Sequence, residues 1–134
     1  MDGQGGSTAV DRPWSRPLRG RLDELVIDSQ VLRGNPLGDA CRRPLWVYTP
    51  PQYAAQPAAR FSTLYLIQGM TGQVDMWRNR GAFRPNVIEL IDELFAGEDP
   101  APPCIVAMVD CWTSYGGSQF LDSPGTGRYH TYLC

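Results

Sequence analysis

The chain has 134 residues, of which 43% are hydrophobic, and a formal net charge of −2. That size suits a single globular domain, and the lack of a basic excess argues against nucleic acid or an anionic membrane as a partner. All twelve basic residues are arginine, which excludes a phosphate-loop lysine, a Schiff base and a Ser-Lys dyad within these residues.

The cysteine and histidine content bears on metal sites and on the cellular compartment. The four cysteines form no Cys-x-x-Cys pair and the chain has a single histidine, so we expect no metal site and no cofactor. No N-terminal basic region precedes an apolar core, and no apolar run approaches the roughly 20 residues that span a bilayer. We therefore expect a cytoplasmic protein with no membrane partner.

The first twenty residues differ from the rest in composition. Residues 1–20 are rich in Gly, Ser, Pro and Arg, which predicts a disordered segment. Apolar and β-branched runs then predict four strands, at 25–32, 45–49, 63–67 and 104–110. The domain is expected to occupy residues 21–134.

A helix is predicted over 85–95, with Pro85 at its first position and Gly97 as its C-terminal cap. Its pattern places an apolar stripe on one side and the acidic residues Glu89, Asp92 and Glu93 toward solvent. The expected stripe comprises Val87, Leu90, Ile91, Leu94 and Phe95. A further helix is expected to begin near Arg128, after a long loop over 112–127.

The order of these elements predicts an α/β fold with a mostly parallel sheet and flanking helices. The first two strands form a hairpin, and the strand-helix-strand unit that follows is expected to be parallel. Glycine-rich loops follow both of its strands, and the carboxyl ends of parallel strands meet at one edge of a sheet. We therefore expect the segment Gln68-Gly-Met-Thr-Gly72 to lie beside the loop 112–127.

Several short motifs occur in an order that resembles a known family. They are Tyr48-Thr-Pro-Pro-Gln-Tyr53, Tyr65-Leu-Ile-Gln-Gly-Met-Thr-Gly72, Val109-Asp110, Gly116-Gly-Ser-Gln-Phe-Leu-Asp-Ser123 and Gly127-Arg-Tyr129. From about Leu25 onward, the chain resembles the esterase family of α/β-hydrolases that includes S-formylglutathione hydrolase, feruloyl esterases, enterochelin esterase and the mycolyltransferases. The resemblance implies a serine hydrolase with a Ser-acid-His triad that acts on small carboxylic esters or thioesters without a metal.

The resemblance also implies site residues. Gly69 and Met70 would form part of an oxyanion hole, with the Met70 N–H as the donor, and Gln68 stands where the family usually has histidine. A substrate loop would include Trp112, Gly116, Gly117, Ser118, Asp122 and Ser123. Trp77 and Trp112 either line an acyl pocket or cover the edge of the core.

No triad residue can be assigned within the chain. It contains no Gly-x-Ser-x-Gly elbow, and neither Ser118 nor Ser123 has the strand-turn-helix context of a nucleophile. Asp122 and Ser123 are expected to hold the loop through side-chain bonds to the backbone. Asp110 comes too early for the triad acid, because the members of this triad run Ser, acid, His. His130 is expected to be a surface or packing residue.

These observations predict the N-terminal half of a serine ester hydrolase, truncated before its nucleophile. Two alternatives remain open. One is an acyltransferase of the mycolyltransferase type, and the other is a non-catalytic α/β binding module that is complete at 134 residues. The sequence predicts neither the substrate nor the oligomeric state.

Overall fold

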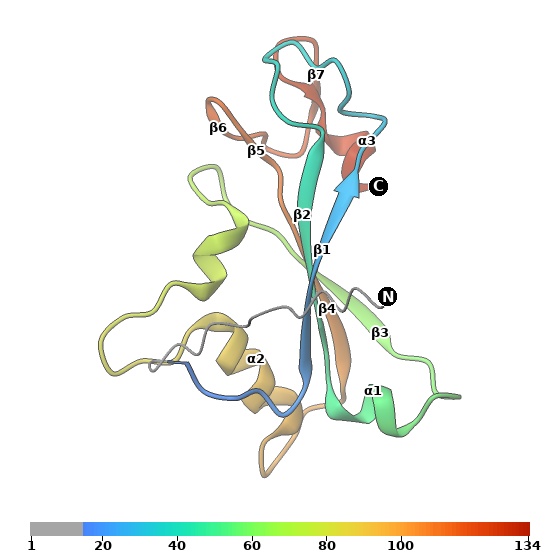
Figure 1. The fold of residues 1–134 in the computed structure, drawn as a ribbon, viewed down its shortest axis with the longest axis vertical. Coiled ribbons are helices and arrows are strands. Elements are labelled where there is room, and N and C mark those ends of the chain that lie inside the picture. Colours follow the sequence, from blue (N-terminus) through green and yellow to red (C-terminus); the bar gives the residue numbers. More distant parts are fainter. Residues whose placement is uncertain (1–14) are drawn as a thin grey trace, which may run out of the picture.

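The computed structural model describes residues 15–134. Its centre is a four-stranded sheet of order β1-β2-β4-β3, formed by β1 (Arg21–Asp28), β2 (Arg42–Thr49), β3 (Ser62–Leu66) and β4 (Cys104–Val109). Four helical segments accompany it: α1 (Pro51–Ala55), the 3-10 helix η1 (Val74–Arg78), α2 (Val87–Ala96) and α3 (Tyr129–Leu133). Two small hairpins follow β4, formed by β5 (Trp112–Thr113) with β6 (Gly116–Gly117) and by β7 (Asp122–Ser123) with β8 (Gly127–Arg128) (Figure 1).

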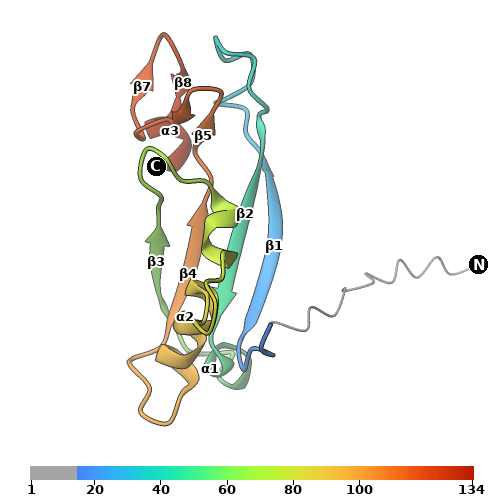
Figure 2. The same cartoon turned by 90° about the vertical axis from the view of Figure 1, so that its left-hand side faces the viewer.

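The prediction of a mostly parallel sheet with flanking helices is wrong. β2 runs antiparallel to both of its neighbours, β1 and β4, and only β3 and β4 are parallel. The expected hairpin and the expected parallel pair are both present, but the strand order inserts the hairpin strand β2 beside β4, which makes two of the three pairings antiparallel. In the described part of the chain only α2 is longer than five residues, and it covers one side of the sheet (Figures 1 and 2).

The face that α2 presents to the sheet also differs from the prediction. Leu90 and Leu94 are 53% and 52% exposed, whereas Glu89 and Asp92 are buried together with Ile88 and Phe95. The two carboxylates are buried because they receive hydrogen bonds from groups far away in the sequence, such as Asp92 from the Tyr48 hydroxyl at 2.9 Å. Polar partners therefore contribute to the rotation of this helix together with Ile88, Ile91 and Phe95, which pack into the core.

The ends of α2 are capped by specific residues. Asn86 caps its N-terminus and forms a capping box with Glu89, so Pro85 lies before the cap and not at the first helical position. Gly97 is at the C-terminal cap, as predicted, and a Cβ there would lie 2.4 Å from the Glu93 carbonyl oxygen. Glycine is therefore required at this cap for steric reasons.

Two apolar clusters lie on the two faces of the sheet. The first, under α2 and η1, contains Trp46, Tyr48, Val74, Ile88, Phe95, Val106 and Met108. The second joins the other face of the sheet to the C-terminal segment and contains Leu32, Val109, Cys111 and Tyr129. Successive residues of a strand point to opposite faces, which is why Met108 and Val109 belong to different clusters.

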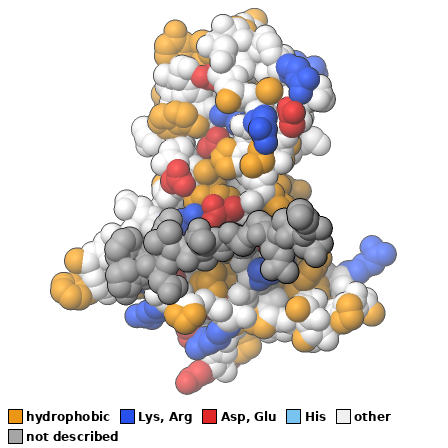
Figure 3. Space-filling view, in the orientation of Figure 1, with side chains coloured by type: hydrophobic (Ala, Val, Ile, Leu, Met, Phe, Trp, Pro, Cys, Tyr) orange, Lys and Arg blue, Asp and Glu red, His pale blue; other side chains and the backbone are white. Residues whose placement is uncertain are grey.

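β3 is an edge strand with apolar side chains in contact with solvent. It pairs only with β4, and Leu64, Tyr65 and the following Ile67 are 51%, 63% and 43% exposed. The space-filling view shows hydrophobic surface at both ends of the molecule, mixed with charges of both signs (Figure 3). Within residues 15–134, no helix has the length and apolar character to cross a membrane.

The predicted disordered segment is described only in part, because residues 1–14 lie outside the described residues. The remaining stretch, 15–20, lies against α2. The Arg16 N–H donates to Glu89 Oε1 at 3.0 Å, and the Gly20 N–H donates to Asp92 Oδ1 at 2.8 Å.

Candidate functional site

A tight turn follows β3 at Gly69–Gly72. The Gly72 N–H donates to the Gly69 carbonyl at 3.0 Å, and neither Met70 nor Thr71 has a positive φ, which is compatible with a type I turn and excludes type II. Among the described residues, the Met70 N–H has no hydrogen-bond partner, and the residue is 58% exposed. Within residues 15–134 the N–H groups of Gly69 and Thr71 likewise have no partner, so the turn leaves the Met70 N–H and its two neighbouring backbone donors free.

The hairpin of β5 and β6 packs directly against this turn. The Gly117 N–H donates to the Met70 carbonyl at 2.6 Å. A Cβ on Gly117 would lie 2.9 Å from the Met70 carbonyl oxygen and 3.0 Å from Met70 Cα. Only glycine permits so close an approach of two backbones. Gly116 beside it has φ +101°, a conformation that also favours glycine.

The structure therefore brings together Gly69 and Met70 of the predicted oxyanion segment and Gly116 and Gly117 of the predicted substrate loop. Gln119, which the sequence did not single out, also reaches Met70, with its Nε2 donating to Sδ at 3.3 Å.

Trp112 and Ser118 flank the glycine pair and have different exposures. The Trp112 residue is 38% exposed beside the turn, and its backbone pairs with Gly117 across the hairpin. Ser118 is buried; its N–H donates to the Cys111 carbonyl at 2.9 Å and its Oγ accepts from the Phe120 N–H at 3.2 Å. Ser118 thus stabilises the loop from inside.

Asp122 and Ser123 belong to the second hairpin, and their bonds are local. Asp122 accepts from the Thr131 N–H at 3.0 Å and from its hydroxyl at 2.6 Å, and these hydrogen bonds hold the pKa of the Asp122 carboxyl below its usual range. Ser123 Oγ accepts from the Gly125 N–H at 3.1 Å. These are the side-chain to backbone bonds that the sequence predicted, and none of them reaches the Gly69–Gly72 turn.

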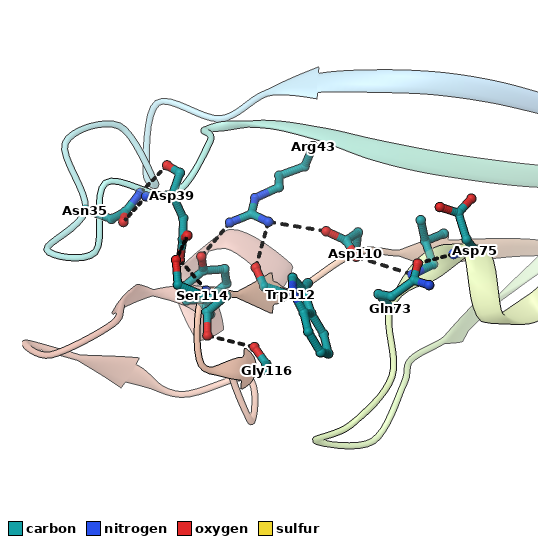
Figure 4. A network of polar contacts seen from close by, with 12 residues as sticks. Asn35, Asp39, Arg43, Gln73, Asp75, Asp110, Trp112, Ser114 and Gly116 are labelled. Carbon is teal, nitrogen blue, oxygen red and sulfur yellow. Dashed lines mark hydrogen bonds and ion pairs between the residues drawn. The ribbon is translucent and has the colours of Figure 1, made fainter.

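A buried polar cluster behind the hairpin was missed in the sequence. Arg43 on β2 donates from Nη1 to the Trp112 carbonyl at 2.7 Å and to Asp110 Oδ2 at 3.3 Å, and from Nη2 to the Tyr129 hydroxyl at 2.6 Å (Figure 4). From the sequence, Asp110 was expected only as part of the Val109-Asp110 motif and as a residue too early in the chain to be the triad acid. The available signal was the alternation of Arg43 with Leu45 and Val47, which puts a charged side chain on a core-facing side of a strand.

Three other residues raised by the sequence have distinct surroundings. Gln68, at the position where the resembling family has histidine, is 5% exposed, and its Nε2 has no partner among the described residues. Trp77 packs against the core cluster under α2, which favours a role in covering the core. His130 is exposed on α3, with its Nε2 3.9 Å from the Cys134 Sγ.

Residues 15–134 assemble neither a metal site nor a nucleophile-base pair. No group of three or more His, Cys, Asp or Glu side chains in this range could hold a metal ion. No serine in this range is hydrogen-bonded to the histidine, so no nucleophile-base pair is assembled there. What the arrangement offers chemically is a free backbone donor next to a glycine-lined surface.

Comparison with known proteins gives a likeness of fold. No family model matches the chain, and no curated protein matches it. Among solved structures, a ferulic acid esterase is similar with a TM-score of 0.59 and 23% sequence identity, over 87% of this chain and 40% of that chain. The chain thus spans less than half the length of this neighbour, and at this identity the similarity concerns the fold.

Proposed function

We propose that the chain is part of a serine carboxylic-ester or thioester hydrolase and supplies one donor of its oxyanion hole, the Met70 N–H. The observation that carries this proposal is the unpartnered Met70 N–H in a turn held by the Gly117 bond. Hydrolysis of an ester passes through a tetrahedral oxyanion, and fixed backbone N–H groups stabilise that charge because they need no reorganisation during the reaction. The name of the ferulic acid esterase with a similar fold supports the same reaction class.

In this proposal the exposed side chains around the turn face the substrate. Met70 and Trp112 are exposed there, and Tyr115 at the tip of the first hairpin is 77% exposed. Together they would contact a small-molecule acyl group. The serine, the acid and the histidine of the mechanism would come from residues beyond those described, and the acyl-enzyme would then be released by water.

The test is ester turnover by the protein expressed from the complete reading frame. The probes are p-nitrophenyl acetate and butyrate, together with labelling by a fluorophosphonate, which reacts with activated serines. Saturable turnover that the label abolishes supports the proposal. A protein that neither hydrolyses these esters nor takes the label contradicts it. Transfer of the acyl group to an added alcohol in preference to water would indicate an acyltransferase instead.

Two glycine-to-alanine substitutions, one at the turn and one away from it, make this test specific to the turn. Gly117→Ala would push its Cβ against the Met70 backbone and should lower turnover sharply, because the turn must move to make room. Gly81→Ala is the matched control, since a Cβ at Gly81 meets nothing within 4 Å and Gly81 lies outside the site. Equal turnover by both variants would show that the turn takes no part in ester hydrolysis.

A further inference from the structure

A buried ion pair lies between β2 and the end of β4. Arg43 Nη1 and Asp110 Oδ2 are 3.3 Å apart, and each side chain is 7% exposed. The Arg43 guanidinium also lies over the Tyr129 ring, with 5.4 Å between Cζ and the ring centroid. Charges at such depth are costly unless they are paired and hydrogen-bonded. Packing of the sheet alone therefore does not account for a buried ion pair at this position.

The pair connects several segments of the chain by hydrogen bonds. Arg43 binds the Trp112 carbonyl and the Tyr129 hydroxyl, while Asp110 Oδ1 accepts from the Val74 N–H at 3.3 Å. Figure 4 shows Arg43 reaching from β2 to Asp110 and Trp112. One guanidinium and one carboxylate thus join the start of η1, the first hairpin and α3 to the sheet.

These bonds fix both ends of the segment that follows the free donor. Val74, two residues after Gly72, is held by Asp110. At the other end, the Met70 carbonyl is held by Gly117, whose hairpin partner Trp112 is bonded to Arg43. The Met70 N–H shares its peptide group with the Gly69 carbonyl, which accepts from the Gly72 N–H within this segment. Two short chains of contacts that begin at the Arg43–Asp110 pair thus hold the segment on which the direction of the Met70 N–H depends.

We propose that Arg43 and Asp110 are positioning residues that orient the Met70 N–H for the oxyanion. This inference rests on the proposed function, since it needs an oxyanion at the turn. Arginine is required because its planar fork serves Asp110, Trp112 and Tyr129 at once, whereas a lysine ammonium is a compact point charge that cannot reach three separated acceptors.

The first experiment asks whether the pair positions the hairpin, and it needs no catalysis. Amide hydrogen exchange is followed by NMR in the protein expressed from the complete reading frame for Arg43→Met, Asp110→Asn and the control Arg33→Met. Arg33 forms an exposed ion pair with Asp28 at the same end of the β1–β2 hairpin, where Asp28 lies opposite Arg42. We expect the Gly117 amide to exchange at least about tenfold faster in Arg43→Met, relative to the amides of the β2–β4 ladder, and to be unchanged in the control.

The second experiment asks whether this positioning serves the reaction. In the protein from the complete reading frame, Arg43→Met should lower kcat for p-nitrophenyl acetate by up to about 10²-fold, the loss expected for a misplaced reacting geometry, with little change in KM. Arg43→Lys should recover only part of that loss. Asp110→Asn, which keeps the shape of the side chain, repeats the test if Arg43→Met folds poorly.

The outcomes separate this inference from the proposed function. Equal acceleration of exchange in the turn and the ladder would overturn the inference, because the pair would then only stabilise the whole fold. An unchanged kcat in a variant whose Gly117 amide exchanges faster would overturn it as well. A wild-type protein without ester turnover would overturn the proposed function, and with it the role of the pair in orienting an oxyanion donor.

Discussion

Replacing Asp92 with alanine should destabilise the fold by about 3 kcal/mol, because one buried carboxylate satisfies three donors. Asp92 Oδ1 accepts from the Tyr48 hydroxyl at 2.9 Å and from the Gly20 N–H at 2.8 Å, and Oδ2 accepts from the Arg19 N–H at 3.0 Å. The Tyr48 residue is 0% exposed, and burial, followed by the bond to Asp92, raises its pKa above the usual range. Among the described residues, Asp92 is the one acceptor bonded to this hydroxyl.

The magnitude follows from what each donor does after the change. A buried hydroxyl left without an acceptor costs about 1–3 kcal/mol. Arg19 is exposed and Gly20 half-buried, so water can replace the carboxylate at these two N–H groups, at a smaller cost of roughly 1 kcal/mol in total. In a Tyr48→Phe background no hydroxyl remains, and Asp92→Ala should then cost only about 1 kcal/mol, a coupling of about 2 kcal/mol.

Urea unfolding followed by tryptophan fluorescence, at low micromolar concentration, measures these differences. Glu93→Ala is the matched control, since Glu93 is the next residue of α2 and its ion pair with Arg19 is exposed. The control should change the free energy of unfolding by at most about 0.5 kcal/mol. The reasoning is refuted if Asp92→Ala costs no more than Glu93→Ala, or if its cost is the same with and without the Tyr48 hydroxyl.

Three further predictions concern pH, thiol reactivity and the sheet edge. Burial opposes ionisation of Glu89, but hydrogen bonds led by the one from Arg80 hold the pKa of its carboxyl below the usual value. The free energy of unfolding should therefore fall as the pH drops from about 5 to 3, because the folded state loses this favourable charge. Glu89→Gln should flatten that part of the pH profile of unfolding. Burial raises the pKa of the Cys111 thiol to about 12, so in the native protein at pH 8 a disulfide reagent should modify the exposed Cys134 and leave Cys111 intact, as peptide mapping would show. Tyr65→Lys on the uncharged edge of β3 should reduce concentration-dependent association in sedimentation velocity, and an unchanged association would mean that this edge is not the contact.

The parts of the fold that could be predicted from sequence are those with a local signal. The apolar runs at 63–67 and 104–110 became β3 and β4, and their parallel pairing follows from the connecting helix. The glycine-rich loops meet where parallel strands end, as expected for Gly69 and Gly117. In both cases a few consecutive residues carry the information, because strand propensity and glycine loops act over short distances.

The parts that could not be predicted depend on partners far apart in the chain. Asp92 faces inward because of Gly20 and Tyr48, 72 and 44 positions away, and its sequence neighbours give no sign of that. Arg43 and Asp110 are separated by 67 positions.

The start of the chain shows the same limit for an apolar residue. The first strand was predicted at 25–32 and therefore to end at Leu32, but β1 covers Arg21–Asp28 instead. Leu32 is fully buried in the turn that follows β1, in the apolar cluster with Tyr129. An apolar residue is predicted to be buried, but its pattern does not show whether it belongs to a strand or to the turn beside it.

The central claim, that the Met70 N–H stabilises an oxyanion, is tested most directly by removing that N–H alone. Met70 is the second residue of the Gly69–Gly72 turn, a position where proline is favoured in type I turns, so Met70→Pro removes the donor with little strain. Met70→Leu keeps the donor and changes only the side chain.

Both variants are compared with wild type, as protein from the complete reading frame, in the turnover of p-nitrophenyl acetate, with circular dichroism to confirm that each is folded. Loss of one oxyanion donor should lower kcat by about 10²–10³-fold in Met70→Pro, while Met70→Leu stays close to wild type. A folded Met70→Pro variant with wild-type turnover would contradict the account.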